Sequence, residues 1–188
     1  TTALLDADIQ LAETVIAGDK AIDRMREEID ALAIDLLARQ NPVATDLRII
    51  VTGMRMSSDL ERMGDLARHV AKVARLRYPE SAVPAETRSV IVQMGHVAQE
   101  IVIKTGSVIA SKDVESAQTL DSDDDAMDEL HRQLLSMLLD GPWKYGVQSA
   151  VDLTLIGRYY ERYADHAVAV ARRIVYVVTG RMPGPLAV

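Results

Sequence analysis

The sequence predicts an all-α protein made of two similar three-helix bundles in tandem. Apolar residues recur at spacings of three and four along most of the chain, which is the periodicity of helices and not of strands. Hydrophobic residues make up 48% of the 188 residues, enough for a packed core, and Phe is absent, so aliphatic side chains and Met carry that core. Two stretches of sequence also recur at nearly the same distance, which indicates an internal duplication.

The first half of the chain divides into two long helical stretches that meet at Asn41-Pro42. We expect Asn41 to cap the N-terminus of the second helix, with Pro42 at its first helical position. The stretch from Pro79 to Pro84 then forms the connection between the two halves, because proline interrupts helices.

The second half reads as a further set of helices that begins near Pro84. Asp140-Gly141-Pro142 has the composition of a helix end, and a last helix from Val147 to Val178 ends before Gly180. The predicted domains are residues 1–80 as the first three-helix repeat, residues 84–180 as the second, and residues 181–188 as a C-terminal tail.

The internal duplication is carried by two pairs of matching blocks. Asp8–Val15 matches Asp113–Leu120 at an offset of 105 residues, and Glu61–Ala67 matches Glu161–Ala167 at an offset of 100. If the first helix of the second repeat starts near Pro84, its counterpart in the first repeat would start before residue 1. We therefore expect the first helix of the first repeat to be truncated by about twenty residues, because repeats share element lengths.

Acidic residues four positions apart recur at matching places in the two repeats. Such a pair lies on one helix face, where like charges cost a few tenths of a kcal/mol, so something should offset the repulsion. In the first repeat the two pairs lie at nearly equal distances from the turn at Asn41, which would place them opposite each other; the second repeat matches less well. The pairs are Asp19/Asp23, Glu61/Asp65, Asp124/Asp128 and Glu161/Asp165.

Converging carboxylates in a chain without cysteine predict a hard, all-oxygen metal site in each repeat. Iron, zinc, magnesium, manganese and calcium all remain candidates for the ion. Two simpler interpretations are that Arg62 and Arg162 neutralise the acids as surface ion pairs, or that Asp19 and Asp124 are helix caps.

Charge and composition exclude several classes of function. Twenty-one basic and 28 acidic residues give a net charge of −7, which argues against binding to nucleic acid. We expect no transmembrane segment, because no run of eighteen apolar residues occurs, and no secretory signal. No catalytic triad order or phosphate-binding glycine loop is present in the sequence.

The motifs of this chain resemble those of the PhoU family of phosphate-signalling regulators. The resemblance rests on Arg39-Gln40-Asn41-Pro42-Val43-Ala44-Thr45-Asp46-Leu47-Arg48, on Asp59-Leu60-Glu61-Arg62-Met63-Gly64-Asp65, and on Tyr160-Glu161-Arg162-Tyr163-Ala164-Asp165-His166-Ala167. It extends over essentially the whole chain, including the duplication. Ala164 departs from the family pattern, which usually has glycine there, as at Gly64.

The resemblance implies a cytoplasmic, non-catalytic protein of two three-helix bundles that binds metal clusters through the four acidic pairs. It also implies an adaptor between the ATPase of the phosphate ABC transporter and a membrane sensor histidine kinase. Such an adaptor keeps the phosphate-starvation response off while phosphate is plentiful. We further expect a homodimer, associated with the membrane at most through its partners.

Two other functions are compatible with the residues. The first is a carboxylate-bridged metal enzyme, such as a di-iron oxidase or a hydrolase, within a helical bundle. Histidines argue against it, because only Asp128-Glu129-Leu130-His131 approximates the Glu-x-x-His spacing of di-iron bundles and it does not recur in the other repeat. The second is an acidic protein-docking face that holds no metal.

Overall fold

The computed structural model describes residues 1–181, and in that range every regular element is an α-helix, which confirms the all-α prediction. The predicted tail at 181–188 lies outside the described residues, except for Arg181. No described helix is both long enough and apolar enough to span a membrane. The helices are α1 (Thr2–Leu5), α2 (Ile9–Gln40), α3 (Ala44–Arg77), α4 (Arg88–Ser111), α5 (Val114–Gln118), α6 (Leu120–Leu139) and α7 (Gly146–Thr179).

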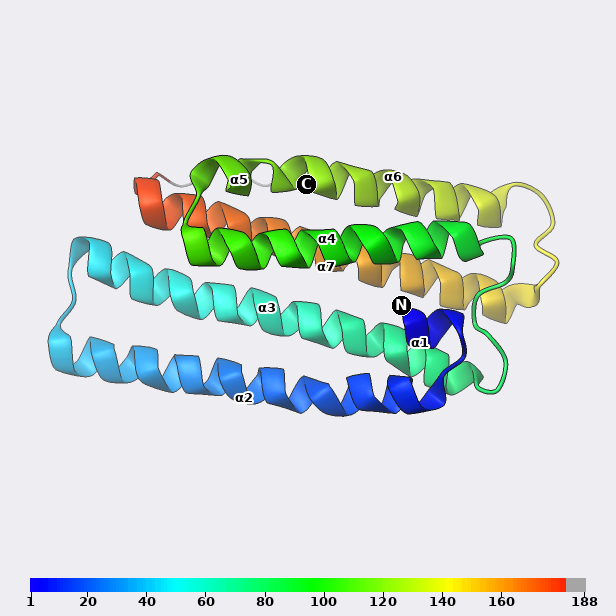
Figure 1. The fold of residues 1–188 in the computed structure, drawn as a ribbon, viewed down its shortest axis with the longest axis horizontal. Coiled ribbons are helices and arrows are strands. Elements are labelled where there is room, and N and C mark those ends of the chain that lie inside the picture. The colour runs from blue at the N-terminus through cyan, green and yellow to red at the C-terminus, as the bar shows by residue number, and fades with distance from the viewer. Residues whose placement is uncertain (182–188) are drawn as a thin grey trace.

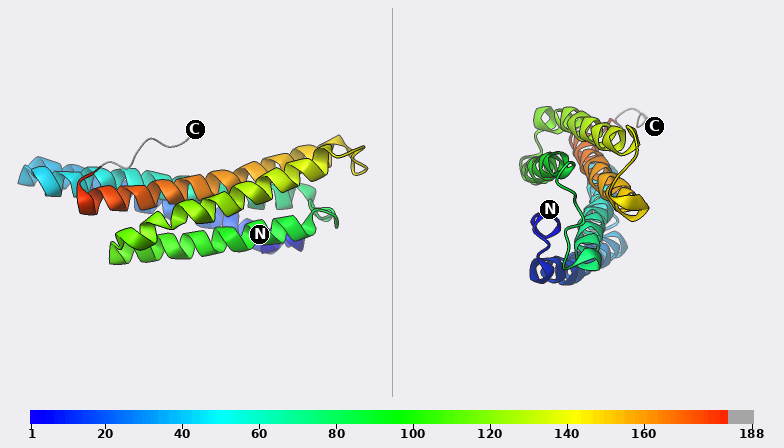
Figure 2. Two further views of the ribbon diagram at one scale, coloured as in Figure 1. Left: turned by 90° about the horizontal axis from the view of Figure 1, so that it is seen from above. Right: turned by 90° about the vertical axis from the view of Figure 1, so that its right-hand side faces the viewer.

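The long helices lie side by side along one axis and give the molecule an elongated shape (Figure 1). The helices α3 and α7 pack against each other at the centre, α2 packs on α3, and α4 and α6 pack on α7. Viewed along the long axis, α6 lies beyond α7, α2 lies beyond α3, and α1 and α4 lie between them on one side of the central pair (Figure 2). Each repeat therefore contributes one long helix to the junction between the repeats.

The helix boundaries follow from capping chemistry that also recurs in both repeats. The Asp8 carboxylate accepts a hydrogen bond from Leu11 N at 2.9 Å, and the Asp113 carboxylate accepts one from Glu115 N at 3.0 Å. The alternative that Asp19 and Asp124 are caps is therefore wrong, since both lie inside helices.

The predicted role of Asn41 is also wrong. This residue ends α2 with a left-handed φ of 44°, and Val43 precedes the first residue of α3. Asparagine tolerates this conformation better than other residues with a β-carbon, so it ends a helix as readily as it starts one. The predicted helix ends at Asp140 and Gly180 are confirmed.

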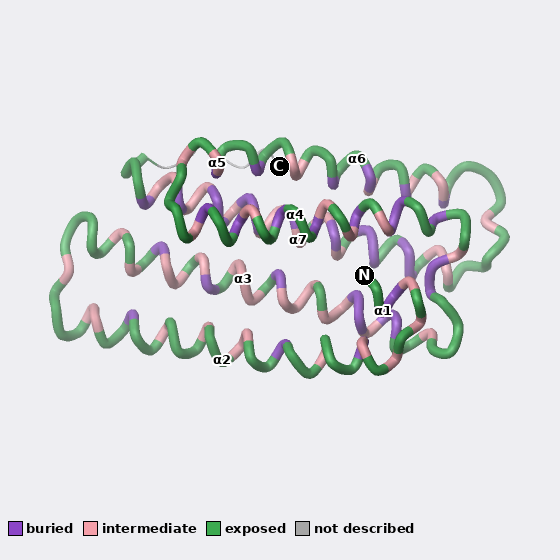
Figure 3. Tube along the Cα trace, in the orientation of Figure 1, coloured by how far each residue is buried: buried purple, intermediate pink, exposed green. Residues whose placement is uncertain are grey.

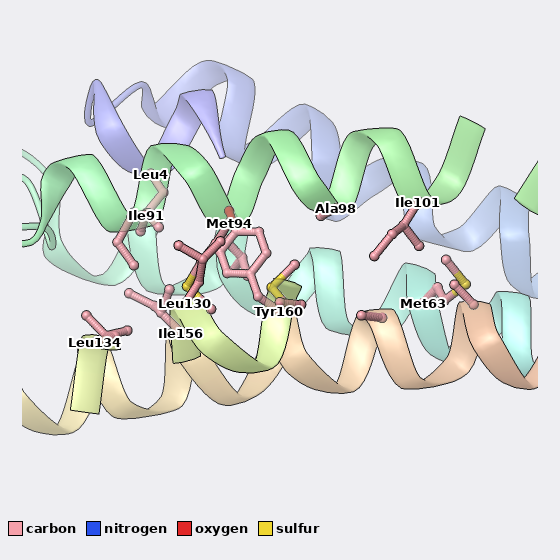
Figure 4. Packing of buried hydrophobic residues seen from close by; sticks show 14 of the residues in the cluster. Leu4, Met63, Ile91, Met94, Ala98, Ile101, Leu130, Leu134, Ile156 and Tyr160 are labelled. Carbon is pink, nitrogen blue, oxygen red and sulfur yellow. The ribbon is translucent and has the colours of Figure 1, made fainter. Parts of the chain in front are cut away.

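The core is a single cluster shared by the two repeats. Ile91 and Met94 of α4 lie beside Ile156 and Tyr160 of α7, and Ile101 lies farther along α4, on the side of Met63 of α3 (Figure 4). The first repeat is less covered, because α1 has 4 residues where the second repeat has the 24-residue α4. Accordingly α2 is mostly exposed along its length (Figure 3).

Candidate metal centres

In the first repeat, Asp19 of α2 lies at a close contact with Gly64 of α3, which stands between Glu61 and Asp65 in the sequence. Asp19 on α2 is 5% exposed and faces Gly64 on α3, where an added Cβ would lie 3.4 Å from Asp19 Oδ1. Glu61 and Asp65 flank Gly64 on the same helix and are half-buried. The predicted convergence of α2 and α3 carboxylates is thus seen for Asp19 and Asp65.

An arginine joins these two carboxylates. Arg68 Nη1 lies 2.8 Å from Asp19 Oδ2, and Arg68 Nη2 donates a hydrogen bond to Asp65 Oδ1. Arg62 Nη1 contacts Asp65 Oδ2 at 3.2 Å from the exposed side, and its Nε lies 4.0 Å from Glu61 Oε2. Guanidinium groups therefore offset the repulsion between the acids. This agrees in part with the simpler interpretation that Arg62 neutralises the acids as a surface ion pair.

The second repeat holds its acids at the α6–α7 contact without such a bridge. Arg158 pairs with Glu161, and Arg162 Nη1 lies 3.2 Å from Asp165 Oδ2, all within α7. Asp124 of α6 is half-buried. Among the described residues, the buried oxygens Asp124 Oδ1 and Glu161 Oε2 have no hydrogen-bond partner, and Asp19 Oδ2 of the first repeat has none besides its ion pair with Arg68.

The electrostatics of the second repeat show that its carboxylates act on one another. Burial raises the pKa of Asp124 to about 7, and the negative charges of Asp165 and Asp128 add to that shift. Burial likewise raises the pKa of Glu161 against the opposing effect of Arg158, and Asp165 and Asp128 raise it further. Carboxylates of α6 and α7 are therefore close enough to repel one another, and the arginines of α7 offset this only in part.

Some predicted ligands are less closely engaged. Asp23 is half-buried and Asp128 is exposed, and neither makes an ion pair within residues 1–181. In the same range, no group of three or more acidic or histidine side chains is arranged to hold a metal ion. A bound ion would thus require the carboxylates to move together and the surface arginines to move away.

The acidic side chains of the second repeat have the oxygen ligands that a hard cation prefers. Two of their buried oxygens have no hydrogen-bond partner in the described chain. The arginines that pair with these acids are half-exposed. The assignment of all eight acids as metal ligands stays a prediction.

Two histidines beside the acidic blocks are engaged in packing and ion pairing. The ring of His69 lies 5.2 Å from that of Tyr159. His166 Nδ1 lies 3.2 Å from Asp59 Oδ1, and Arg173 Nε donates to Asp59 Oδ2 at 2.7 Å, which joins α3 to α7. Burial alone would raise the pKa of Asp59, but the hydrogen bonds from His166 and Arg173 outweigh it and lower the pKa.

Arg68 is the residue near the sites that the sequence patterns did not single out. The signal was present, because the repeats match around Glu61 and Glu161, whereas at the same 100-residue offset Arg68 falls on Val168. A break in a repeat next to a charged motif indicates that the two copies are not equivalent.

The fold and the acidic pairs define a class of helical protein: two related repeats with carboxylates at corresponding positions. Proteins of this class are known. The PhoU domain family matches residues 1–74 and 91–174, and the chain belongs to this family. A phosphate-specific transport system accessory protein, PhoU homolog 2 of Mycobacterium tuberculosis, is 49% identical over 183 residues, which cover 97% of this chain and 86% of the relative. Homolog 1 of Mycobacterium leprae is also 49% identical, over 97% and 82% of the two chains.

Solved structures show the same fold. The crystal structure of PhoU from Pseudomonas aeruginosa has a TM-score of 0.85 and 30% identity, over 96% of this chain and 87% of that one. The phosphate transport system regulatory protein PhoU from Streptococcus pneumoniae has a TM-score of 0.82 and 26% identity, over 97% and 86%. An accessory role in phosphate transport is therefore the general function of the family to which the chain belongs.

Proposed function

We propose that the chain is a non-catalytic regulator of phosphate uptake and phosphate-starvation signalling. It acts in the cytoplasm as a homodimeric adaptor between the ATPase of the phosphate ABC transporter and a sensor histidine kinase, and it keeps the response off while phosphate is plentiful. The observation that carries the regulatory role is family membership over both repeats, together with relatives named as accessory and regulatory proteins.

Direct binding to the two partners tests the adaptor role. The chain would be immobilised and exposed in turn to the transporter ATPase and to the cytoplasmic part of the kinase from the same organism, with an unrelated ABC ATPase as control. We expect saturable binding to both partners and none to the control. Failure to bind either partner in its folded state would contradict the proposal. Equilibrium sedimentation of the chain alone tests the homodimer.

We propose that the acidic pairs of each repeat form metal sites. A bound cation would reduce the repulsion among the carboxylates of each repeat, and the buried oxygens of Asp124 and Glu161 that have no hydrogen-bond partner support this role. Elemental analysis of the purified chain, compared with an Asp65→Ala/Asp165→Ala variant, measures it. We expect less metal in the variant, and equal content would remove the assignment.

No observation favours the alternative of a metal enzyme. His166 and His69 contact Asp59 and Tyr159, and no histidine occurs at matching positions of the two repeats. Dialysis into ferrous iron followed by oxygen-uptake measurements should show no turnover. Sustained uptake would reverse the ranking of the two functions.

A further inference from the structure

The start of α7 has an exposed apolar stripe. Val147, Val151 and Leu155 are four positions apart, so they share one face of the helix, and they are 82%, 51% and 42% exposed. The stripe extends over about two turns, roughly 12 Å. It lies at the end of the molecule where the chain passes from α6 to α7 (Figure 1). Contiguous apolar surface of this kind indicates an interaction site.

The connection between α6 and α7 makes a groove beside this stripe, which we call the α7 groove. Pro142 and Trp143 of the connection line it together with α7 residues that include the stripe, and its volume is about 610 Å³. The lining is almost entirely apolar, and Trp143 also packs against the core of the protein. Tryptophan in a pocket is a frequent anchor of protein–protein contacts, and a groove along a helix suits the apolar row of a second helix.

Basic side chains are the more exposed members of the ion pairs that border the α7 groove. In the connection, Lys144 pairs with Glu86, and the two side chains are 65% and 44% exposed. One turn beyond Leu155, Arg158 pairs with Glu161, and these side chains are 52% and 15% exposed. An approaching partner therefore meets the cation of each pair before the anion.

The N-terminus of α7 adds to this positive charge. The free N–H groups of a helix N-terminus carry a partial positive charge. Within the described residues, no side chain caps α7 at Tyr145, and no acidic residue lies in its first turn. The first turn of α3, the corresponding helix of the other repeat, contains Asp46. One end of the α7 groove therefore favours an anionic group.

The corresponding surface of α3 does not have this combination of features. Leu47 and Val51, at the 100-residue offset from Val147 and Val151, are also apolar and are 40% and 36% exposed. The tryptophan, the two cations and the third apolar residue of α7 are all replaced in α3. At the same offset, Val43 corresponds to Trp143, Ala44 to Lys144, Arg55 to Leu155 and Ser58 to Arg158.

We propose that the α7 groove binds an amphipathic helix of a partner protein, with an apolar row flanked at both ends by acidic residues. The apolar row covers Val147, Val151 and Leu155, and the acidic residues lie near Lys144 and Arg158. Surface ion pairs contribute little, so both cations can turn toward the acids of the partner at small cost. This inference rests on the proposed adaptor role and assigns a surface to it.

Fluorescence of the chain measures this binding directly, because Trp143 is its only tryptophan. Two synthetic helical peptides with the same row of leucines are titrated into the full chain, one with Glu and one with Lys at both ends of the row. We expect the acidic peptide to shift the Trp143 emission saturably and the basic peptide to bind at least about tenfold more weakly. Lys144→Gln/Arg158→Gln should remove this preference.

A matched pair of variants locates the binding surface. Val147→Ser/Val151→Ser changes the α7 groove, and Leu47→Ser/Val51→Ser changes the corresponding positions of α3. All four side chains are exposed, so both variants should fold. We expect the first variant to bind the acidic peptide at least about tenfold more weakly, because it buries less apolar surface, and the second to bind it unchanged.

Other occupants of the α7 groove give different results. Equal binding of the two peptides, or equal losses from the two double variants, would overturn the inference. A shift of Trp143 emission on concentrating the chain alone would assign the groove to a second copy. A shift with phosphatidylglycerol vesicles but not with the peptides would assign it to a lipid surface. Either of these results would also overturn the inference.

Binding of the transporter ATPase and of the kinase separates the inference from the adaptor role. If Val147→Ser/Val151→Ser binds both partners as tightly as the unaltered chain does, the α7 groove is not their docking site and the adaptor role stands. If the chain binds the acidic peptide in the groove but neither partner, the adaptor role fails and the chemistry assigned to the groove stands.

Discussion

Asp19 and Asp124 occupy matching positions in the repeats, yet their surroundings differ in charge. Asp19 is nearly buried and contacts Arg68, whereas Asp124 is half-buried and faces Asp165 and Asp128. A carboxyl group in the second environment resists ionisation, because both burial and like charges disfavour the anion. Asp124 therefore keeps its proton to a pH well above 3.8, the ordinary pKa of an aspartate.

This difference predicts a pH-dependent stability for the metal-free chain. The pKa of Asp124 is raised from 3.8 to about 7, so between these values the folded chain holds a proton that the unfolded chain releases. The free energy of unfolding should then decrease as the pH rises from about 4 to about 7. Asp124→Asn should remove this part of the slope and stabilise the chain at pH 7.5 by roughly 1–2 kcal/mol, since solvent screens part of the repulsion.

Urea unfolding in EDTA across this pH range measures the effect. Asp125→Asn is the matched control, because Asp125 is the exposed neighbour of Asp124, and we expect a much smaller change. A slope that is the same in the unaltered chain and in Asp124→Asn would contradict the assigned pKa.

At the scale of the elements, small residues set how closely the helices approach. A Cβ added at Gly64 would lie 2.8 Å from Ile22 Cδ1 of α2, whereas one added at Gly53, on the same helix, would meet nothing within 4 Å. The corresponding residue in the second repeat is Ala164, which is fully buried in the α7 packing. The first repeat thus brings its helices together at a position without a side chain, next to its acids.

Two substitutions in α3 should therefore have opposite effects. Gly64→Leu should destabilise the fold by about 2 kcal/mol, because the added side chain overpacks the contact with Ile22. Gly53→Ala should stabilise it by about 0.5–1 kcal/mol, because alanine favours helix and has open space there. Thermal unfolding followed by circular dichroism compares the two, and a destabilising Gly53→Ala would show that the open space is absent.

At the scale of the whole molecule, a partly buried ion pair joins the repeats where α3 ends and α7 begins. Arg77, the last residue of α3, contacts Asp152 near the start of α7, with Nε–Oδ2 and Nη2–Oδ1 distances of 2.5 and 3.0 Å. The side chains are 23% and 9% exposed. Positions 100 residues away hold Thr52 and Val177, so this contact has no counterpart in the other repeat.

Removing Asp152 should weaken the junction between the repeats. We expect Asp152→Ala to lower the free energy of unfolding by roughly 2–3 kcal/mol, because Arg77 is left mostly buried without its anion. Glu129→Ala is the control, since the Arg132–Glu129 pair is 69% and 65% exposed, and its loss should cost less than about 0.5 kcal/mol. Equal effects in denaturant unfolding would contradict the structural role given to the Arg77–Asp152 pair.

The sequence predicts this architecture better than it predicts the surroundings of the acids. Helical periodicity and the blocks at Asp8 and Asp113 are local features, so the fold class and the duplication could be read directly. The convergence of Asp19 with Asp65 followed from helix length. Helix length does not predict that Arg68 bridges the two acids. Whether a side chain reaches across a helix contact depends on how the helices rotate and pack, and periodicity does not determine this. The N-cap predicted for Asn41 is wrong because asparagine favours both ends of helices.

The 4-residue α1 covers α2 less than the 24-residue α4 covers α6, so one of the two corresponding helix faces is open. Met25 and Ile29 on α2 are 61% and 41% exposed, whereas Leu130 and Leu134, at the matching positions of α6, are 9% and 0% exposed. Because α4 covers α6 while only α1 lies over α2, the same apolar pattern faces the core in one repeat and solvent in the other.

We expect Met25→Ser/Ile29→Ser to change the free energy of unfolding by less than about 1 kcal/mol and to reduce both binding of a hydrophobic dye and self-association, since these side chains bury little surface. Leu130→Ser/Leu134→Ser, at the matching positions, should cost several kcal/mol, about 2–5 for each leucine, and unfold the second repeat. Equilibrium unfolding and light scattering of both variants compare the two helix faces. Similar destabilisation by the two variants would mean that the face of α2 is covered in solution, as it is on α6.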